Sequence, residues 1–156
     1  MPWDPMPARD ADGNVLAHDD PAAVPPEWTL LRHVHREQWA WIEATQSYRP
    51  QSNAFMFSTE GSHSMSVDIE PPMREAGLSS TYYAFTVGKG VVRITTEQAR
   101  QLGLRVGPEP IQGNPHHGGI WEGNPAIPKS QLDKHRRTLS RAAELVALPP
   151  DGIAQR

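Results

Sequence analysis

Hydrophobic and polar residues alternate in two stretches of the first half of the chain. In residues 28–35, one face would carry Leu31, His33 and His35, and the other face is mainly aliphatic. In residues 64–69, methionine, valine and isoleucine alternate with serine and aspartate. A period of two is typical of strands with one buried face. Both stretches are therefore predicted to be strands.

Three other stretches predict helices. Residues 71–77 begin with two prolines and end at Gly77, which suits a short helix. Thr95 and Gln98 have the spacing of a capping box, which predicts a helix over residues 96–102. Residues 130–147 have leucine, alanine and valine at helical spacing among basic residues, which predicts a closing amphipathic helix.

The remaining periodic segments are short. Residues 81–87 and 91–95 predict a hairpin about Gly88-Lys89-Gly90, and further short strands are expected at 54–58, 104–106 and 120–122. Residues 37–44 suit a short helix or an extended continuation of the first strand. Strands interrupted by short helices predict the α+β class. We expect a small mixed or antiparallel sheet with short helices, and the C-terminal amphipathic helix packed on it.

Composition divides the chain into three parts. Residues 1–27 hold six prolines and six acidic residues against one base, so we expect a flexible acidic arm. Residues 28–148 form one predicted α+β domain, and residues 149–156 a flexible tail. From residue 28 onward, the chain has 14 Lys and Arg and 12 Asp and Glu, which is unlike a globally basic nucleic-acid binder.

The chain has no cysteine, which excludes disulfide frameworks, thiolate metal sites and a cysteine nucleophile. No apolar run approaches the roughly 20 residues of a membrane helix, and the N-terminus lacks the pattern of a secretory signal. We therefore expect a cytoplasmic protein with no membrane partner.

Several short motifs occur in a fixed order: Arg49-Pro50-x-Ser52-x-Ala54-Phe55, then Met65-Ser66-Val67, then Gly113-x-Pro115-x-His117. In this order they resemble a set of short bacterial proteins that have no assigned activity. The resemblance implies a single domain from about residue 30 and adds no chemistry. A second histidine, His116, stands where small residues are more usual in that set.

Asn114-Pro115-His116-His117 is the strongest candidate for a site. Imidazole titrates near neutrality, so a histidine pair can exchange protons or bind a metal. Adjacent residues on extended backbone point to opposite sides, so one of the two should face a given pocket. His117, nearer the following strand, is the candidate for catalysis, and His116 and Asn114 are candidates for binding. Alternatively, both histidines are loop residues that hydrogen-bond to the turn.

His33 and His35 would share one face of the first strand. With His117, or an oxygen of Asp68, as a third ligand they could hold a divalent metal in a catalytic-type site. The sequence contains no established zinc motif. The alternative is two independently hydrogen-bonded histidines.

Arg49 lies in a polar segment beside Ser52. A guanidinium can clamp a phosphate or carboxylate with two hydrogen bonds, and Ser52 could add a donor. The alternative is that Arg49 orders its own loop. On the closing helix, Arg136 and Arg137 belong to a basic stripe that could contact an anionic partner or the acidic arm, or could simply be solvated.

Two functions follow from these patterns. The favoured one is an interaction or accessory module that binds a protein or anionic partner through the acidic arm or the basic helix. The alternative is a small enzyme in which His35 and His117 act as an acid–base pair and Arg49 holds the anion of a phosphodiester or nucleotide-type substrate. A divalent metal could assist it. Nucleic acid is open as a partner but is not favoured.

Overall fold

The computed structural model describes Trp3 and residues 5–154. Within these residues, six strands form an antiparallel sheet in the order β6-β7-β4-β1-β5-β8, and β2 and β3 form a separate ribbon. The strands are β1 (Thr29–Val34), β2 (Trp39–Ile42), β3 (Ser47–Pro50), β4 (Met65–Ile69), β5 (Gly90–Thr95), β6 (Arg105–Pro108), β7 (His117–Trp121) and β8 (Glu144–Ala147). The helices are α1 (Glu70–Glu75), α2 (Tyr82–Thr86), α3 (Thr96–Gln101) and α4 (Lys129–Ala142), with 3-10 turns η1 (Glu43–Thr45) and η2 (Ser52–Phe55).

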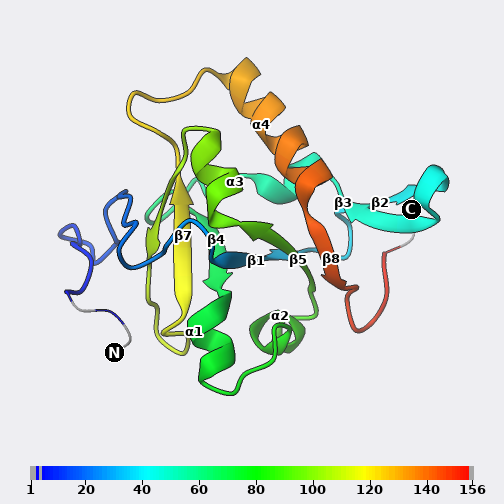
Figure 1. Cartoon of the computed structure of the whole chain (residues 1–156), viewed down its shortest axis with the longest axis horizontal. Helices are drawn as coiled ribbons and strands as arrows, with labels where there is room; N and C mark the ends of the chain where they lie inside the picture. The colour runs from blue at the N-terminus through cyan, green and yellow to red at the C-terminus, as the bar shows by residue number, and fades with distance from the viewer. Residues whose placement is uncertain (1–2, 4, 155–156) are drawn as a thin grey trace.

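The sheet is covered on both faces, which confirms the α+β class. The larger core lies under α3, α4 and η2 and includes Leu30, Val34 and Val67. A smaller core on the opposite face joins Leu31 of β1 to α1 and α2. Figure 1 shows α3 and α4 above the sheet and α1 and α2 below it. The alternation in residues 28–35 therefore separates two hydrophobic clusters rather than a core from solvent.

Two local predictions are confirmed. The side chain of Thr95 accepts from the Gln98 amide, and the side chain of Gln98 accepts from the Thr95 amide, so the capping box opens α3. Helix α1 has proline in its first turn, and Gly77 follows with a φ of +86°. That backbone conformation favours glycine and ends the helix.

Other segments differ from their predictions. Within residues 81–87, Tyr82–Thr86 form helix α2 rather than a hairpin strand, because Ala84 packs into the smaller core. Residues 52–55 form η2 rather than the start of a strand, and residues 39–42 form β2. The closing helix ends at Ala142, and residues 144–147 become edge strand β8, which pairs with β5. Short apolar runs fit either a helix or a strand, and tertiary packing decides between them.

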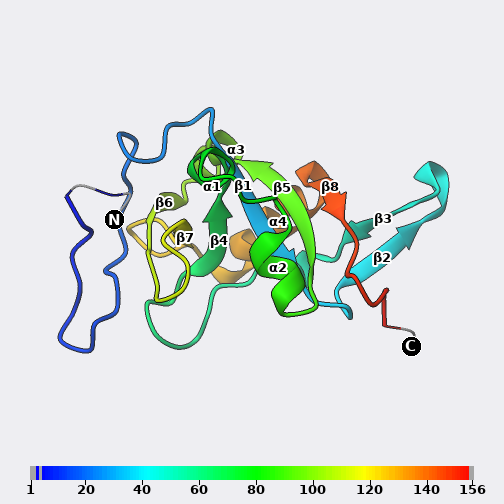
Figure 2. The same ribbon diagram turned by 90° about the horizontal axis from the view of Figure 1, so that it is seen from below.

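The described residues of both segments that were expected to be flexible contact the domain. In the N-terminal segment, Trp3, Val15 and Val24 are buried. Asp19 bonds to the guanidinium of Arg100 and to the amide of Val106. Figure 2 shows this segment beside β6 and β7. At the other end, the Ala154 amide donates to the Arg36 carbonyl over 3.0 Å.

The strands β1 and β4 pair over only two positions, Leu30 with Ile69 and Leu31 with Asp68. Beyond these positions, side-chain hydrogen bonds of Arg32 take the place of backbone pairing between the strands. Its Nη1 donates to the Ser66 carbonyl over 2.7 Å and its Nε to the Ala54 carbonyl over 2.8 Å. Burial lowers the Arg32 pKa to about 10. The two strands therefore diverge around a guanidinium.

Within the described residues, no helix has both the length and the apolar composition that crossing a bilayer requires.

Candidate functional site

A cleft of about 550 Å³ lies on the α1–α2 side of the sheet, where β1 and β4 diverge. One wall comes from β1 and the segment after it, and the floor from β4 and β7. Helix α2 with its following turn, and the loop of residues 111–114, complete the rim. Four of its lining residues, His33, His35, Asn114 and His117, were candidates from the sequence.

His33 and Asp68 form the central contact of the cleft. His33 Nε2 lies 2.7 Å from Asp68 Oδ2, and the carboxylate is 1% exposed. Register explains the contact, because Asp68 pairs with Leu31 and so shares a sheet face with His33, two residues further along. The carboxylate accepts the Nε2–H, so in a neutral ring the lone pair resides on Nδ1.

Asn114 holds the other side of this carboxylate. Its Nδ2 donates to Asp68 Oδ1 over 2.8 Å, and its own Oδ1 accepts from the His116 amide over 2.9 Å. The buried carboxylate thus accepts from two side chains on different elements. Its orientation is fixed from both directions, as buried polar networks require.

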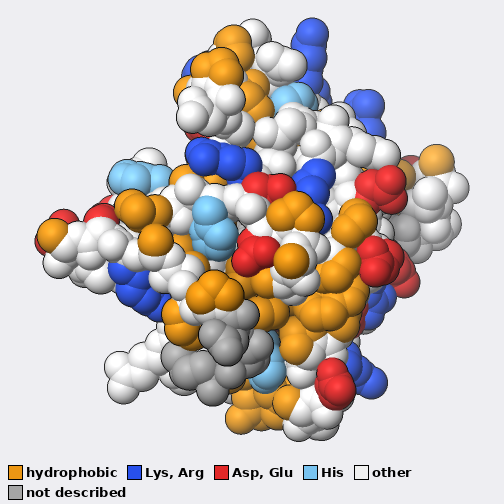
Figure 3. All heavy atoms as spheres, turned by 60° about the vertical axis from the view of Figure 1, so that its left-hand side comes forward, with side chains coloured by type: hydrophobic (Ala, Val, Ile, Leu, Met, Phe, Trp, Pro, Cys, Tyr) orange, Lys and Arg blue, Asp and Glu red, His pale blue; other side chains and the backbone are white. Residues whose placement is uncertain are grey.

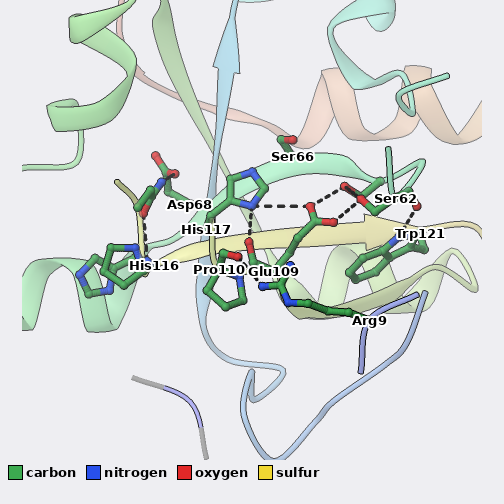
Figure 4. Close-up of polar contacts among 12 residues, drawn as sticks. Arg9, Ser62, Ser66, Asp68, Glu109, Pro110, His116, His117 and Trp121 are labelled. Atoms are coloured by element: carbon green, nitrogen blue, oxygen red, sulfur yellow. Dashed lines mark hydrogen bonds and ion pairs between the residues drawn. The ribbon is translucent and has the colours of Figure 1, made fainter. Parts of the chain in front are cut away.

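His117 enters the cleft from β7, directly opposite Asp68 in the strand register. Its Nδ1 lies 2.7 Å from the Glu109 carbonyl oxygen and 3.6 Å from Glu109 Oε1. Figure 4 shows the ring held above β7 by these contacts. Because Nδ1–H donates to the carbonyl, the other ring nitrogen, Nε2, carries the lone pair in the neutral form.

The neighbouring His116 is oriented differently. It is buried, and Figure 4 shows its ring on the opposite side from that of His117. Its Nδ1 is buried without a partner among the described residues. Burial lowers the His116 pKa, while the charge of Asp68 acts in the opposite direction. Its amide, rather than its ring, takes part in the network through Asn114.

Two cationic residues line the cleft, Arg32 and the half-buried Lys89. Neither has an acidic partner within residues 5–154. Burial lowers the Lys89 pKa, and the charge of Arg32 lowers it further. Tyr83 faces the same space, where burial and the charge of Asp68 raise its pKa. The cleft thus combines unpaired positive charge with the histidine–carboxylate pair.

A second hollow of about 310 Å³ shares Ser66, Ile111 and His117 with the cleft. In it, Ser64 Oγ donates to Glu109 Oε1 over 2.6 Å, and Ser62 donates to Glu109 Oε2. Figure 4 shows Ser62 between Glu109 and Trp121. Both hydroxyls are directed at a carboxylate, so they position Glu109 and, through it, His117.

The sequence also proposed His33, His35 and His117 as metal ligands. These histidines line one cleft, but among the described residues no group of three His, Cys, Asp or Glu is placed to hold a metal ion. In this structure the nitrogen Nε2 of His33 faces Asp68 instead. His35 lies just after β1, and its backbone amide donates to Gln38 Oε1.

The proposed anion clamp lies elsewhere. Arg49 and Ser52 line a separate hollow with Arg137, next to α4. Arg136 pairs with Asp133 on the helix. Arg49 is therefore not placed to hold an anion in the histidine cleft. Its strand, β3, belongs to the separate ribbon, which diverges from the sheet (Figure 1).

Sequence reasoning missed two features of the cleft. Asp68 was considered only as a metal ligand, although its place on the polar face of a strand, in register with the histidines, makes it the partner of His33. Lys89 was interpreted only as part of a turn, and no local pattern brings a turn lysine to a cleft.

The N-terminal side of the molecule, in Figure 3, has acidic, basic and histidine side chains interspersed.

Comparisons with protein-family models, with curated proteins and with solved structures found no match to this chain.

Proposed function

We propose that the protein is a small enzyme that uses His33 and His117 for proton transfer on a phosphoester substrate held in the cleft. The observation that carries this proposal is the 2.7 Å contact between His33 and buried Asp68, in a cleft that His117 also lines. A carboxylate behind an imidazole fixes its tautomer and stabilises the protonated ring. His33 takes the role that the sequence gave to His35.

The cations support an anionic substrate. Lys89 and Arg32 line the cleft without acidic partners among the described residues, and a bound phosphate would compensate their charge. Lys89 replaces Arg49 as the group that would hold the anion. Arg32 already donates to two carbonyls, so its contribution is mainly electrostatic.

The two histidines suit complementary roles. His33 Nδ1 would accept the proton of an attacking water or substrate hydroxyl while its oxygen forms a bond to phosphorus. The bond from phosphorus to the leaving oxygen breaks, and protonated His117 donates its Nε2 proton to that oxygen. General acid–base catalysis of this kind contributes about 10² to 10⁴ in rate for each group.

The interaction module favoured by the sequence would bind its partner through the acidic arm or through the basic last helix. In the structure, Asp19 of the acidic arm bonds to Arg100 and Val106 of the domain. These contacts support the N-terminal segment as a partner surface less well than the cleft supports a small-molecule substrate.

The test is a turnover assay with 4-nitrophenyl phosphate, bis(4-nitrophenyl) phosphate and a ribonucleoside 2′,3′-cyclic phosphate. We expect turnover of at least one substrate, and a loss of about 10²-fold or more in His33→Ala and His117→Ala. His63→Asn is the matched control, because His63 is exposed, lies outside the cleft and has a positive φ that asparagine tolerates. No turnover of any ester, or equal rates in all variants, would refute the proposal.

A further inference from the structure

Three arginines converge on a hollow that shares no lining residue with the histidine cleft. Arg49 comes from β3, and Arg137 and Arg141 come from successive turns of α4. The hollow has a volume of about 260 Å³, and Ser52 lines it as well. Residues almost ninety positions apart in the chain therefore form one basic site.

The packing of α4 fixes this arrangement. Ser140 is buried, and its hydroxyl donates to the Pro50 carbonyl over 2.6 Å. That bond joins the helix to the residue immediately after Arg49. Helix α4 also packs along η2, which contains Ser52. The basic side chains are thus brought together by a buried contact rather than by chance proximity of surface loops.

The charge of the site is uncompensated. No Asp or Glu lines the hollow, and none of its three arginines has an ion-pair partner within the described part of the chain. Like charges one helical turn apart destabilise a helix, so such a cluster is unfavourable without a counter-charge. An anion between the arginines would remove that repulsion.

The size of the site and its hydrogen-bond donors indicate which anion it would bind. Guanidinium groups match the oxygens of phosphate with paired hydrogen bonds, and more than one can share a single phosphate. The volume is below the usual range for sites that enclose an entire drug-sized ligand. We propose that Arg49, Arg137 and Arg141, with Ser52, form a phosphate-binding site. It binds the phosphate group of a nucleotide-like small molecule or of a nucleic-acid strand.

The test measures binding to the full-length chain. Calorimetry with inorganic phosphate and pyrophosphate examines the free anion, and fluorescence anisotropy with a labelled single-stranded oligonucleotide examines the strand. In Arg49→Gln/Arg137→Gln we expect at least about tenfold weaker binding of whichever probe the native protein binds. Raising the salt concentration should weaken that binding further.

The control is Arg74→Gln/Lys134→Gln, which removes the same charge from exposed positions outside the hollow. Thermal unfolding should show that both double variants are folded. Retained binding in the control, with loss in the site variant, supports the proposal for either source of phosphate. Equal loss in both variants would show a response to net charge alone and overturn it. The absence of binding to all three probes would overturn it as well.

Discussion

Asp68 and His33 lie on neighbouring strands, and their side chains meet 2.7 Å apart on the face of the sheet that α1 and α2 cover. Because Asp68 also accepts from Asn114, the carboxylate serves two donors that approach different oxygens. An amide at this position has only one acceptor oxygen and could satisfy only one of them.

Asp68→Asn should therefore change the tautomer of His33 while leaving the fold intact. If the proposed function holds, the rate should fall by about 10²- to 10⁴-fold, because the imidazole loses the group that orients it. Nitrogen NMR of the histidine rings would report the tautomer without any substrate. An unchanged His33 spectrum in the variant would contradict the assignment.

Lys89→Gln should weaken substrate binding more than it slows chemistry. Lys89 lines the cleft and lacks an acidic partner among the described residues, so its loss removes attraction for the anion in both ground and transition states. We expect KM to rise by about tenfold with kcat little changed. Steady-state kinetics at low and high salt would check this, with Lys134→Gln as the control at an exposed position. A fall in kcat alone would assign Lys89 a different role.

Stability should depend on pH through Glu70. Burial acts to raise the Glu70 pKa, but hydrogen bonds from Arg93, Ser80 and Thr29 together outweigh it and lower the pKa to about 2. Because the folded pKa lies below the ordinary value of 4.5, the stabilisation is present above about pH 5 and is lost as the pH falls toward 2.

Glu70→Gln should lower the free energy of unfolding by about 2 kcal/mol at pH 7 and flatten its decline below pH 5. Urea unfolding across this range measures both effects. Glu75→Gln is the control, because Glu75 is an exposed acid on the same helix. If the free energy of unfolding of Glu70→Gln falls as steeply below pH 5 as that of the native protein, other carboxylates control the stability in acid.

Gly107→Ala should displace the N-terminal segment. A Cβ at Gly107 would clash with the imidazole ring of His18, and His18 packs on Trp121 with ring centroids 5.0 Å apart. Overpacking of this kind lowers stability by about 1–3 kcal/mol. Limited proteolysis should cut the segment before residue 27 faster in the variant. The double variant His18→Ala/Gly107→Ala removes the clash. Adding Gly107→Ala to His18→Ala should therefore cost much less stability than adding it to the native protein.

Thr95→Ala should destabilise the protein by about 1 kcal/mol, since it removes one half of the capping box of α3. Thr95→Ser retains the hydroxyl and should stay close to the native value. Chemical unfolding of the two variants compares them directly. Equal losses would mean that the threonine acts through its methyl group.

The sequence predicted those elements whose signals are local. The alternation around His33 and the capping box at Thr95 depend only on neighbouring residues, and both are present in the structure. Residues 81–87 contain aromatic and β-branched residues that suit a strand, yet packing of Ala84 on Met73 and Leu31 makes them helical. The end of α4 is decided in the same way, because residues 144–147 complete the sheet beside β5.

The site was only partly accessible from sequence for the same reason. Side chains on one strand face can be paired by periodicity, which brought His33 and His35 together. To place His117 near these histidines, one must know the order of the strands in the sheet. To pair Asp68 with His33, one must also know the strand register. Chemistry alone paired Arg49 with the histidines, but the ribbon that carries Arg49 places it beside α4.

Arg32 has a consequence for how any ligand would be received. Its guanidinium donates to the Ser66 carbonyl of β4 and to the Ala54 carbonyl of η2, in the stretch where β1 and β4 no longer pair. The space between the two strands therefore exists before a ligand enters it. A ligand that fits there enters a preformed cleft, so little of its binding free energy is needed to separate the two strands.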